Sequence, residues 1–279
     1  MAEGCSGSCD SCGSGGDCGH RKVAECMALV KNKYFVLSGK GGVGKSSIAA
    51  LLALSLADEG RKVGLLDVDF HGPSQPTLFG VADARLEGDE TGDLLMPLEA
   101  AGIKLVSIGL VLEDNDQAVI WRGPAKMGIL QQLVSSVKWG ELDDLVFDFP
   151  PGTGDEILSA CQLIPGRKRA VIVTTPQEVS LADCRKCLDF CRQLQLEVAG
   201  VVENMSGFVC PNCGARHDLF ASGGGEKLAA KYHIPLLAQL PLDPKFMRDC
   251  DAGTLPDTLE DYPEISRSMR DVAKGLSRE

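Results

Sequence analysis

The sequence predicts a doubly wound α/β fold with a mostly parallel sheet. From residue 34 onward, short apolar runs alternate with longer segments of helical period. A glycine-rich segment joins the first apolar run to the first helical segment. Short strands that alternate with helices indicate a parallel sheet covered by helices on both faces. The 279 residues, 44% of them hydrophobic, are enough for one main domain.

The predicted strands are short runs rich in aliphatic residues: Tyr34–Leu37, Lys62–Val68, Lys104–Ile108, Asp144–Phe149, Ala170–Thr174 and Val198–Val202. The predicted helices have apolar residues three and four positions apart. They are Ser46–Glu59, Lys126–Val137, Glu156–Leu163, Leu181–Gln193 and Gly225–Tyr232.

Two further helical stripes are interpreted as core. Buried cysteine behaves as a small hydrophobic residue, so the first stripe, which consists of three cysteines, needs no metal. The second lacks aromatic anchors and a basic face, which favours packing over membrane binding. The stripes are Cys184, Cys187 and Cys191, and Ile265, Met269, Val272 and Leu276.

Residues 1–30 are predicted to form a cysteine-rich, metal-binding tail, and residues 31–279 the α/β domain. The first twenty residues are mainly Gly, Ser, Cys and Asp, a composition that cannot bury enough apolar surface to fold alone. We therefore expect a bound metal to order this tail.

The composition also argues against a nucleic-acid-binding protein, a membrane protein and a disulfide-bonded protein. The net charge of −11 argues against a nucleic-acid partner, because affinity for duplexes depends on Lys and Arg. No apolar stretch reaches the roughly 18 residues of a membrane span, and no signal peptide is visible, so a cytoplasmic location is expected. Cytosolic thiols stay reduced, and the twelve cysteines therefore indicate metal binding more than disulfides.

The segment SGKGGVGKSS, at residues 38–47, lies between the first predicted strand and the first predicted helix. It has the spacing G-x-x-x-x-G-K-[ST] of a P-loop. Backbone N–H groups there surround phosphate oxygens, Lys45 adds positive charge and Ser46 ligates Mg²⁺. The predicted nucleotide-binding residues are Gly39, Lys40, Gly41, Gly42, Val43, Gly44, Lys45, Ser46 and Ser47.

Acidic residues end two of the predicted strands, where ligands bind in open α/β sheets. Asp67 and Asp69 end the run LLDVD, and Asp148 ends LVFD before the loop PPGTGD. Carboxylates at these positions can orient an attacking water or hold Mg²⁺, and the loop can sense a γ-phosphate. Together with the P-loop they predict an ATPase.

Cys210 and Cys213 form a C-x-x-C turn that supplies two thiolates, half of a four-ligand site. Thiolates suit zinc or an iron–sulfur cluster, so the other ligands come from elsewhere in the chain or from a twin subunit. His217 is a candidate third ligand for zinc. A redox pair is less favoured because the motif follows a strand instead of opening a helix.

In these motifs the chain resembles the Mrp/ApbC-type iron–sulfur carrier ATPases, within the deviant Walker A group that includes MinD and the nitrogenase iron protein. The resemblance covers almost the whole chain after about residue 33. Besides KGGVGKS, it rests on LLDVDFHGPS (65–74), WRGPAKMG (121–128), WGELDDLVFDFPPGTGD (139–155), GVVENMSGFVCPNCG (200–214) and LPLDP (240–244).

The resemblance implies roles for individual residues. Lys40, the second lysine of the deviant class, would contact phosphates across a dimer interface. Asp67 and Asp148 would support Mg²⁺ and the switch beside Ser46, and Asn204 would recognise adenine. Asp69 would position the attacking water, so the implied catalytic residues are Lys40, Lys45 and Asp69.

The resemblance also implies a [4Fe–4S] cluster bridged by Cys210 and Cys213 of two subunits. Part of the tail, C-x2-C-x5-C, resembles the eukaryotic cytosolic scaffold members, whose first cysteine lies further upstream than Cys5 does here. Zinc is the main alternative in the tail, and a disordered tail without metal is the other. Its predicted ligands are Cys5, Cys9, Cys12 and Cys18, with Cys26 as a possible substitute.

The predicted function is a homodimeric ATPase that holds iron–sulfur clusters and transfers them to apo client proteins, using ATP and Mg²⁺. One alternative is a MinD-like nucleotide switch with a structural zinc, which requires a membrane helix or a basic patch. The other is an ATP-driven iron–sulfur reductase, for which the cluster cysteines are expected on separate loops.

Overall fold

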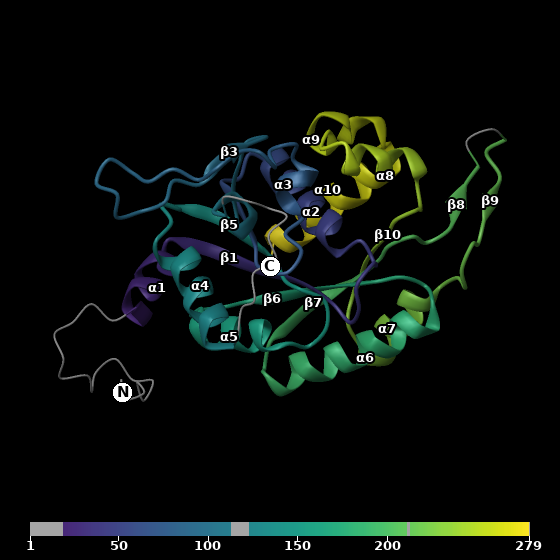
Figure 1. The fold of residues 1–279 in the computed structure, drawn as a ribbon. Coiled ribbons are helices and arrows are strands. Elements are labelled where there is room, and N and C mark those ends of the chain that lie inside the picture. The colour runs from purple at the N-terminus through teal and green to yellow at the C-terminus, as the bar shows by residue number, and fades with distance from the viewer. Residues whose placement is uncertain (1–18, 113–122, 211–212, 279) are drawn as a thin grey trace.

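The computed structural model describes residues 19–112, 123–210 and 213–278 (Figure 1). The tail cysteines Cys5, Cys9, Cys12 and Cys18 lie outside these ranges.

An eight-stranded sheet with the order β10-β7-β6-β1-β5-β2-β4-β3 forms the centre of the domain. All neighbouring strands are parallel except the pair β3 and β4. The strands are β1 Val30–Ser38, β2 Val63–Asp67, β3 Leu98–Ala100, β4 Ile103–Ser107, β5 Leu142–Asp148, β6 Arg169–Thr174, β7 Glu197–Glu203 and β10 Leu236–Gln239. The six predicted strands are confirmed, and the short edge strands β3 and β10 are additions.

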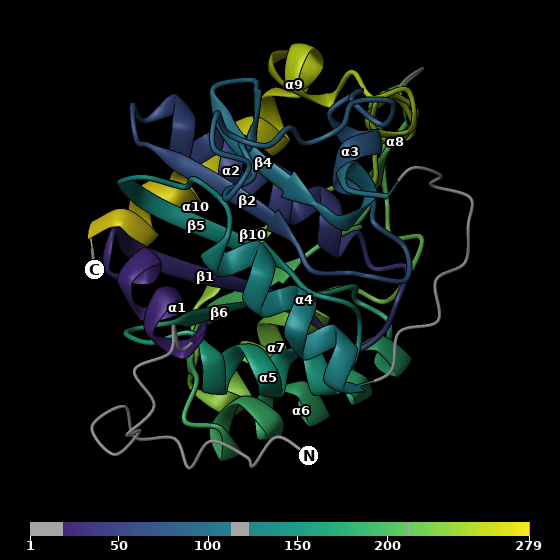
Figure 2. The ribbon, with the colours of Figure 1, turned by 60° about the vertical axis from the view of Figure 1, so that its left-hand side comes forward.

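Helices cover both faces of the sheet, which confirms the doubly wound fold (Figures 1 and 2). One face carries α1 Gly19–Ala28, α4 Gly123–Ser135, α5 Asp155–Leu163, α6 Glu178–Gln193 and α7 Gly224–Tyr232. The other carries α2 Lys45–Asp58, α3 Gln75–Leu78, α8 Pro244–Asp251, α9 Leu255–Thr258 and α10 Pro263–Arg278. All five predicted helices are present.

The apolar sequence of helix α2 explains why this helix lies between the sheet and another helix. It is apolar on nearly every side, and its residues 48–56 are all buried. Such a helix needs an apolar partner on each side. The sheet supplies one, and α10, which packs along α2, supplies the other.

The last helix, α10, buries the predicted stripe of Ile265, Met269, Val272 and Leu276, which confirms the packing interpretation. Among the described residues, no helix is both long enough and apolar enough to cross a membrane. The stripe of Cys184, Cys187 and Cys191 on α6 is also fully buried, so it belongs to the core as predicted.

The part of residues 1–30 that the structure describes is the helix α1 followed by the start of β1. Val23 and Met27 are buried, and α1 packs against α4. Cys26 lies on this helix and its thiol is 3.5 Å from the Ser135 carbonyl oxygen. Apolar residues at positions 23 and 27, one helical turn apart, explain why this segment joins the domain.

Candidate nucleotide and metal sites

The P-loop joins β1 to α2 at the C-terminal edge of the sheet and lines a cavity of about 320 Å³. Asp69, Ser74 and Pro151 come to this cavity from two other loops. The structure thus brings most of the predicted phosphate-binding residues together with the predicted catalytic Asp69. The lining residues are Ser38, Lys40, Gly41, Gly42, Gly44, Lys45, Ser46, Ser47, Asp69, Ser74 and Pro151.

Lys45 and Asp148 form a buried ion pair beneath the cavity, with side-chain exposures of 7% and 0%. The Lys45 ammonium also donates to the Ser46 hydroxyl at 3.2 Å. The other oxygen of Asp148 accepts a 2.8 Å hydrogen bond from Gln75 Nε2. Two donors therefore hold the strand-end carboxylate of β5 against the first turn of α2.

Asp67 is fully buried and organises the loop that follows β2. Its carboxylate accepts hydrogen bonds from the backbone N–H groups of Asp69, Ser74 and Gln75 and from the Ser107 hydroxyl, at 3.0–3.2 Å. Burial and the neighbouring Asp148 carboxylate raise the pKa of Asp67. Asp67 therefore shapes the loop that presents Asp69, and it does not itself line the cavity.

Asp69 sits at the start of this loop, and its carboxylate accepts from the backbone N–H groups of His71 and Gly72 at 3.3 and 3.2 Å. These bonds hold the side chain at the wall of the cavity. A carboxylate placed there can accept a proton from a water, or orient it, beside a phosphate bound to the P-loop.

The residues around Lys45 fit a magnesium ion. Magnesium prefers hard oxygen ligands, and the Ser46 hydroxyl and the carboxylates of Asp69 and Asp148 lie at or beneath one cavity. The Ser74 hydroxyl is buried there and has no hydrogen-bond partner among the described residues. An unpaired buried hydroxyl is unfavourable unless a ligand or water satisfies it.

Asn204 follows β7 and contacts the P-loop directly. Its amide donates to the Val43 carbonyl at 3.0 Å. Gly44 has a φ of 82°, and a Cβ added there would lie 2.2 Å from the Asn204 amide nitrogen, so only glycine allows this approach. The predicted adenine residue is thus placed beside the phosphate loop.

The C-x-x-C cysteines lie on a separate two-stranded hairpin, β8 Phe208–Val209 and β9 Arg216–His217, which projects from the body of the domain (Figure 1). The Cys210 backbone N–H donates to Ala215 O at 2.9 Å, and the Gly214 N–H donates to Cys210 O at 2.8 Å. Cys213 is exposed. A projecting tip with two thiols can meet a second molecule.

His217 does not complete this site within the chain. No group of three or more His, Cys, Asp or Glu side chains suited to a metal occurs in the described part of the chain. His217 is exposed on β9, and its ring lies 6.5 Å from the Phe208 ring. The hypothesis of a third ligand from His217 is therefore not supported.

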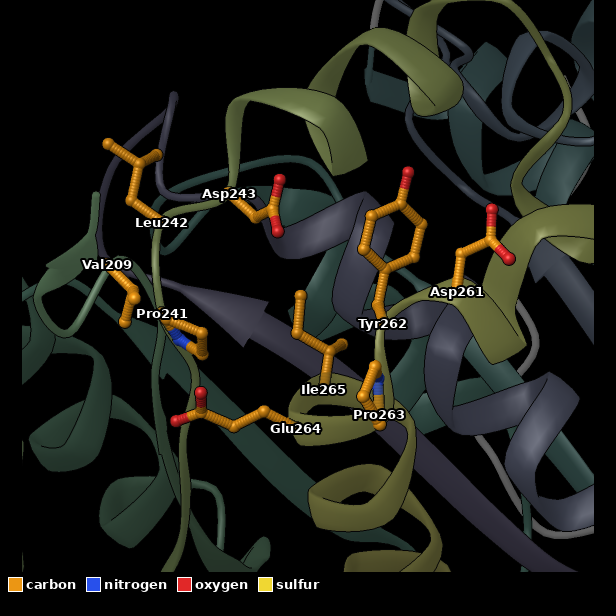
Figure 3. Close-up of a pocket in the computed structure, with 9 residues that line it drawn as sticks. All are labelled: Val209, Pro241, Leu242, Asp243, Asp261, Tyr262, Pro263, Glu264 and Ile265. Carbon is orange, nitrogen blue, oxygen red and sulfur yellow. The ribbon is translucent and has the colours of Figure 1, made fainter. Parts of the chain in front are cut away.

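A second cavity, of about 290 Å³, lies beside the base of the hairpin (Figure 3). Val209, Pro241 and Leu242 face Tyr262 and Ile265 across it. Asp243 at its rim caps α8 by accepting from the Lys245 and Phe246 backbone N–H groups. This carboxylate is thus engaged in local structure.

Sequence reasoning did not assign Ser74, Gln75 or Ser107 to the site. Ser74 is the last residue of the segment LLDVDFHGPS, which also contains Asp67 and Asp69, and Gln75 follows it directly. Polar residues shortly after an acidic strand end are the signal for them in the sequence. Ser107 ends β4, and its link to Asp67 follows from the adjacency of β2 and β4.

Known proteins resemble the chain over nearly its whole length. The family model of the NUBPL iron-transfer P-loop NTPase, in the ParA group, matches residues 29–277. An iron–sulfur cluster carrier protein of Methanocaldococcus jannaschii is 44% identical over 286 residues, 99% of this chain and 97% of the relative. The cytosolic Fe-S cluster assembly factor NUBP2 of Gallus gallus is 46% identical over 249 residues, 88% of this chain and 91% of the relative.

Solved structures agree with this assignment. A nucleotide-binding protein of Archaeoglobus fulgidus in complex with ADP has a TM-score of 0.76 at 38% identity, covering 88% of this chain and 95% of that one. The cell division ATPase MinD of Pyrococcus furiosus has a TM-score of 0.64 at 20% identity, covering 88% and 98%, and shares the fold. The resemblance predicted from sequence is thus confirmed: the chain belongs to the NUBPL-type iron-transfer P-loop NTPases.

Proposed function

We propose that this protein is a homodimeric ATPase that binds an iron–sulfur cluster between two copies of the C-x-x-C hairpin and transfers it to apo client proteins. Its curated relatives are named as cluster carriers and assembly factors. ATP with Mg²⁺ would occupy the P-loop cavity, and Lys40 would reach the phosphates of the partner subunit.

The observation that carries the proposal is the position of Cys210 and Cys213. They lie on a projecting hairpin, and the described residues offer no third ligand nearby. A cluster with four thiolate ligands is completed when two hairpins meet. The cluster is cargo in this scheme, and an exposed site at a subunit interface suits cargo that must leave.

The residues of the nucleotide site suit phosphoryl transfer to water. The P-loop N–H groups and Lys45 bind and orient the phosphates, and Asp69 orients the attacking water. Magnesium, when bound, would neutralise charge on the phosphate oxygens; Ser46 would hold it, with support from Asp148 and Asp67. Loss of the γ-phosphate would change the shape of the dimer, and this change would alter access to the cluster held between the hairpins.

The tail forms a second part of the proposal. Cys5, Cys9, Cys12 and Cys18 would hold a second cluster or a zinc ion, and Cys26 is the substitute ligand. The Cys26 thiol is half-buried and lies 3.5 Å from the Ser135 carbonyl oxygen, which favours Cys5 over Cys26 as the fourth ligand.

Anaerobic native mass spectrometry of the reconstituted protein tests the proposal. The wild type should appear as a dimer with one more iron–sulfur unit than the Cys210→Ala/Cys213→Ala variant, and the variant should pass less cluster to an apo-ferredoxin. The matched control is Cys161→Ala, which alters a half-buried thiol on α5. Zinc in place of iron, or unchanged metal in the hairpin variant, would favour the nucleotide switch.

A further inference from the structure

Gln75 connects three parts of the nucleotide site. It is the first residue of α3 and is fully buried. Its amide nitrogen donates to the Ser46 backbone carbonyl at 2.9 Å and to Asp148 Oδ2 at 2.8 Å. One side chain therefore ties the loop after β2 to the end of β5 and to the first turn of α2.

The orientation of the Gln75 amide follows from its neighbours. The carbonyl of Ser46 and the carboxylate of Asp148 are both acceptors, so the nitrogen must face them. The amide oxygen is then left buried and has no partner among the described residues. An apolar side chain of equal length would fill the space without this unpaired oxygen, so the useful part of Gln75 is its pair of N–H bonds.

These bonds matter because of the charge on Asp148. A fully buried carboxylate needs donors, and Asp148 has two from side chains, Lys45 and Gln75. Under the proposed function, Lys45 must also contact nucleotide phosphates. When it turns toward them, Gln75 is the neutral donor that still holds Asp148.

We propose that Gln75 is a positioning residue of the nucleotide site. The inference rests on the proposed function. The Gln75 amide keeps Asp148 fixed against α2, so that Lys45 can be shared between Asp148 and a phosphate. Asp148 then remains placed to support Mg²⁺ beside Ser46.

The test is Gln75→Met, which keeps length and volume but removes both donors. We expect ADP affinity in EDTA to change less than about twofold, since the P-loop itself is intact. The gain in ADP affinity on adding Mg²⁺ should fall about tenfold, the equivalent of one lost hydrogen bond to a charged group. The kcat for ATP should fall about tenfold with KM within about threefold.

Gln193→Met is the matched control, because it removes an amide-to-carboxylate bond, 2.7 Å to Asp189, on the exposed face of α6. Should Gln75→Met not fold, Gln75→Asn keeps an amide that is one methylene too short, and the same loss of the Mg²⁺-dependent gain in ADP affinity is expected. Wild-type Mg²⁺ dependence in a folded variant overturns the inference, as does an equal loss with and without Mg²⁺. A wild type that binds no nucleotide overturns the proposed function itself.

Discussion

The buried guanidinium of Arg169 on β6 donates a 2.6 Å hydrogen bond to the backbone carbonyl of Leu276 in α10, 107 residues away. The same nitrogen donates to the Tyr34 hydroxyl at 2.7 Å, and the guanidinium lies over the Tyr34 ring. The sheet thus holds the end of the last helix through a charged side chain.

We predict that Arg169→Met lowers the free energy of unfolding by about 3 kcal/mol, because buried hydrogen bonds to a charged group are lost and the Leu276 carbonyl keeps only the 3.2 Å bond from the Tyr34 hydroxyl. Tyr34→Phe, which removes only the hydroxyl, should lower it by about 1 kcal/mol. Urea denaturation measures both. Equal values for the two variants would mean that the guanidinium adds nothing beyond packing.

The ion pair of Lys45 and Asp148 predicts strong coupling between two substitutions. Lys45→Met leaves a buried carboxylate without its counter-charge and should lower the free energy of unfolding by about 3–5 kcal/mol. In Lys45→Met/Asp148→Asn the charge is gone, and most of this loss should be recovered. A double-mutant cycle measures the coupling, and additive losses would contradict the prediction.

Gly39 predicts a steric effect at the start of the P-loop. A Cβ added there would lie 2.3 Å from the backbone carbon of Asp183 and 2.5 Å from the nitrogen of Cys184, in α6. Gly39→Ala should therefore lower the free energy of unfolding by about 2–3 kcal/mol and weaken ADP binding.

Gly41→Ala is the control for this effect, because its Cβ would meet only Pro151 Cγ, at 3.7 Å. The melting temperatures of the two variants, measured by thermal unfolding, should differ by several degrees. If the melting temperatures coincide, α6 can move away from the P-loop at little cost.

Lys33 predicts a rise in stability at alkaline pH. Its ammonium is buried on β1 and donates to the Val30 carbonyl at 2.9 Å. Burial, followed by repulsion from Lys168, lowers the pKa of Lys33. Between this lowered value and the ordinary value near 10.4, the unfolded chain binds more protons than the folded one, so stability rises with pH.

In Lys33→Met this contribution is absent. The variant should be more stable than the wild type at pH 7, and the difference should shrink as pH approaches 11. Urea denaturation at pH 7, 9 and 10.5 measures the trend. The control is Lys62→Met, which replaces an exposed lysine. A constant difference between wild type and variant would show that Lys33 keeps its ordinary pKa.

The surroundings of Cys26 predict which cysteine would complete the metal site proposed for the tail. Burial raises the pKa of its thiol, which also contacts Ser135, so it is a poor thiolate. Cys26→Ser should leave the metal content of the tail unchanged, whereas Cys5→Ser should reduce it. Each substitution is made in the Cys210→Ala/Cys213→Ala variant, and the bound iron and zinc are measured. If Cys26→Ser reduces the metal content and Cys5→Ser does not, Cys26 is the ligand.

The local motifs could be predicted from the sequence because each depends on residues that are close together in the chain. A P-loop needs only a strand, a glycine-rich turn and a helix start, so residues 38–47 identify it. Strand ends at Asp67 and Asp148 follow from short apolar runs. Edge strands such as β10, only Leu236–Gln239, carry too few residues for a period to be visible.

The sequence by itself thus determined the fold class, the phosphate loop and the C-x-x-C motif. Only the tertiary structure decided that Gln75 reaches Asp148, 73 residues away, and that α1 joins the core through Val23 and Met27. It also decided that Cys210 and Cys213 lie on a projecting hairpin. Such relationships arise from how strands are ordered and helices packed, and side-chain contacts between distant segments leave no period in the sequence.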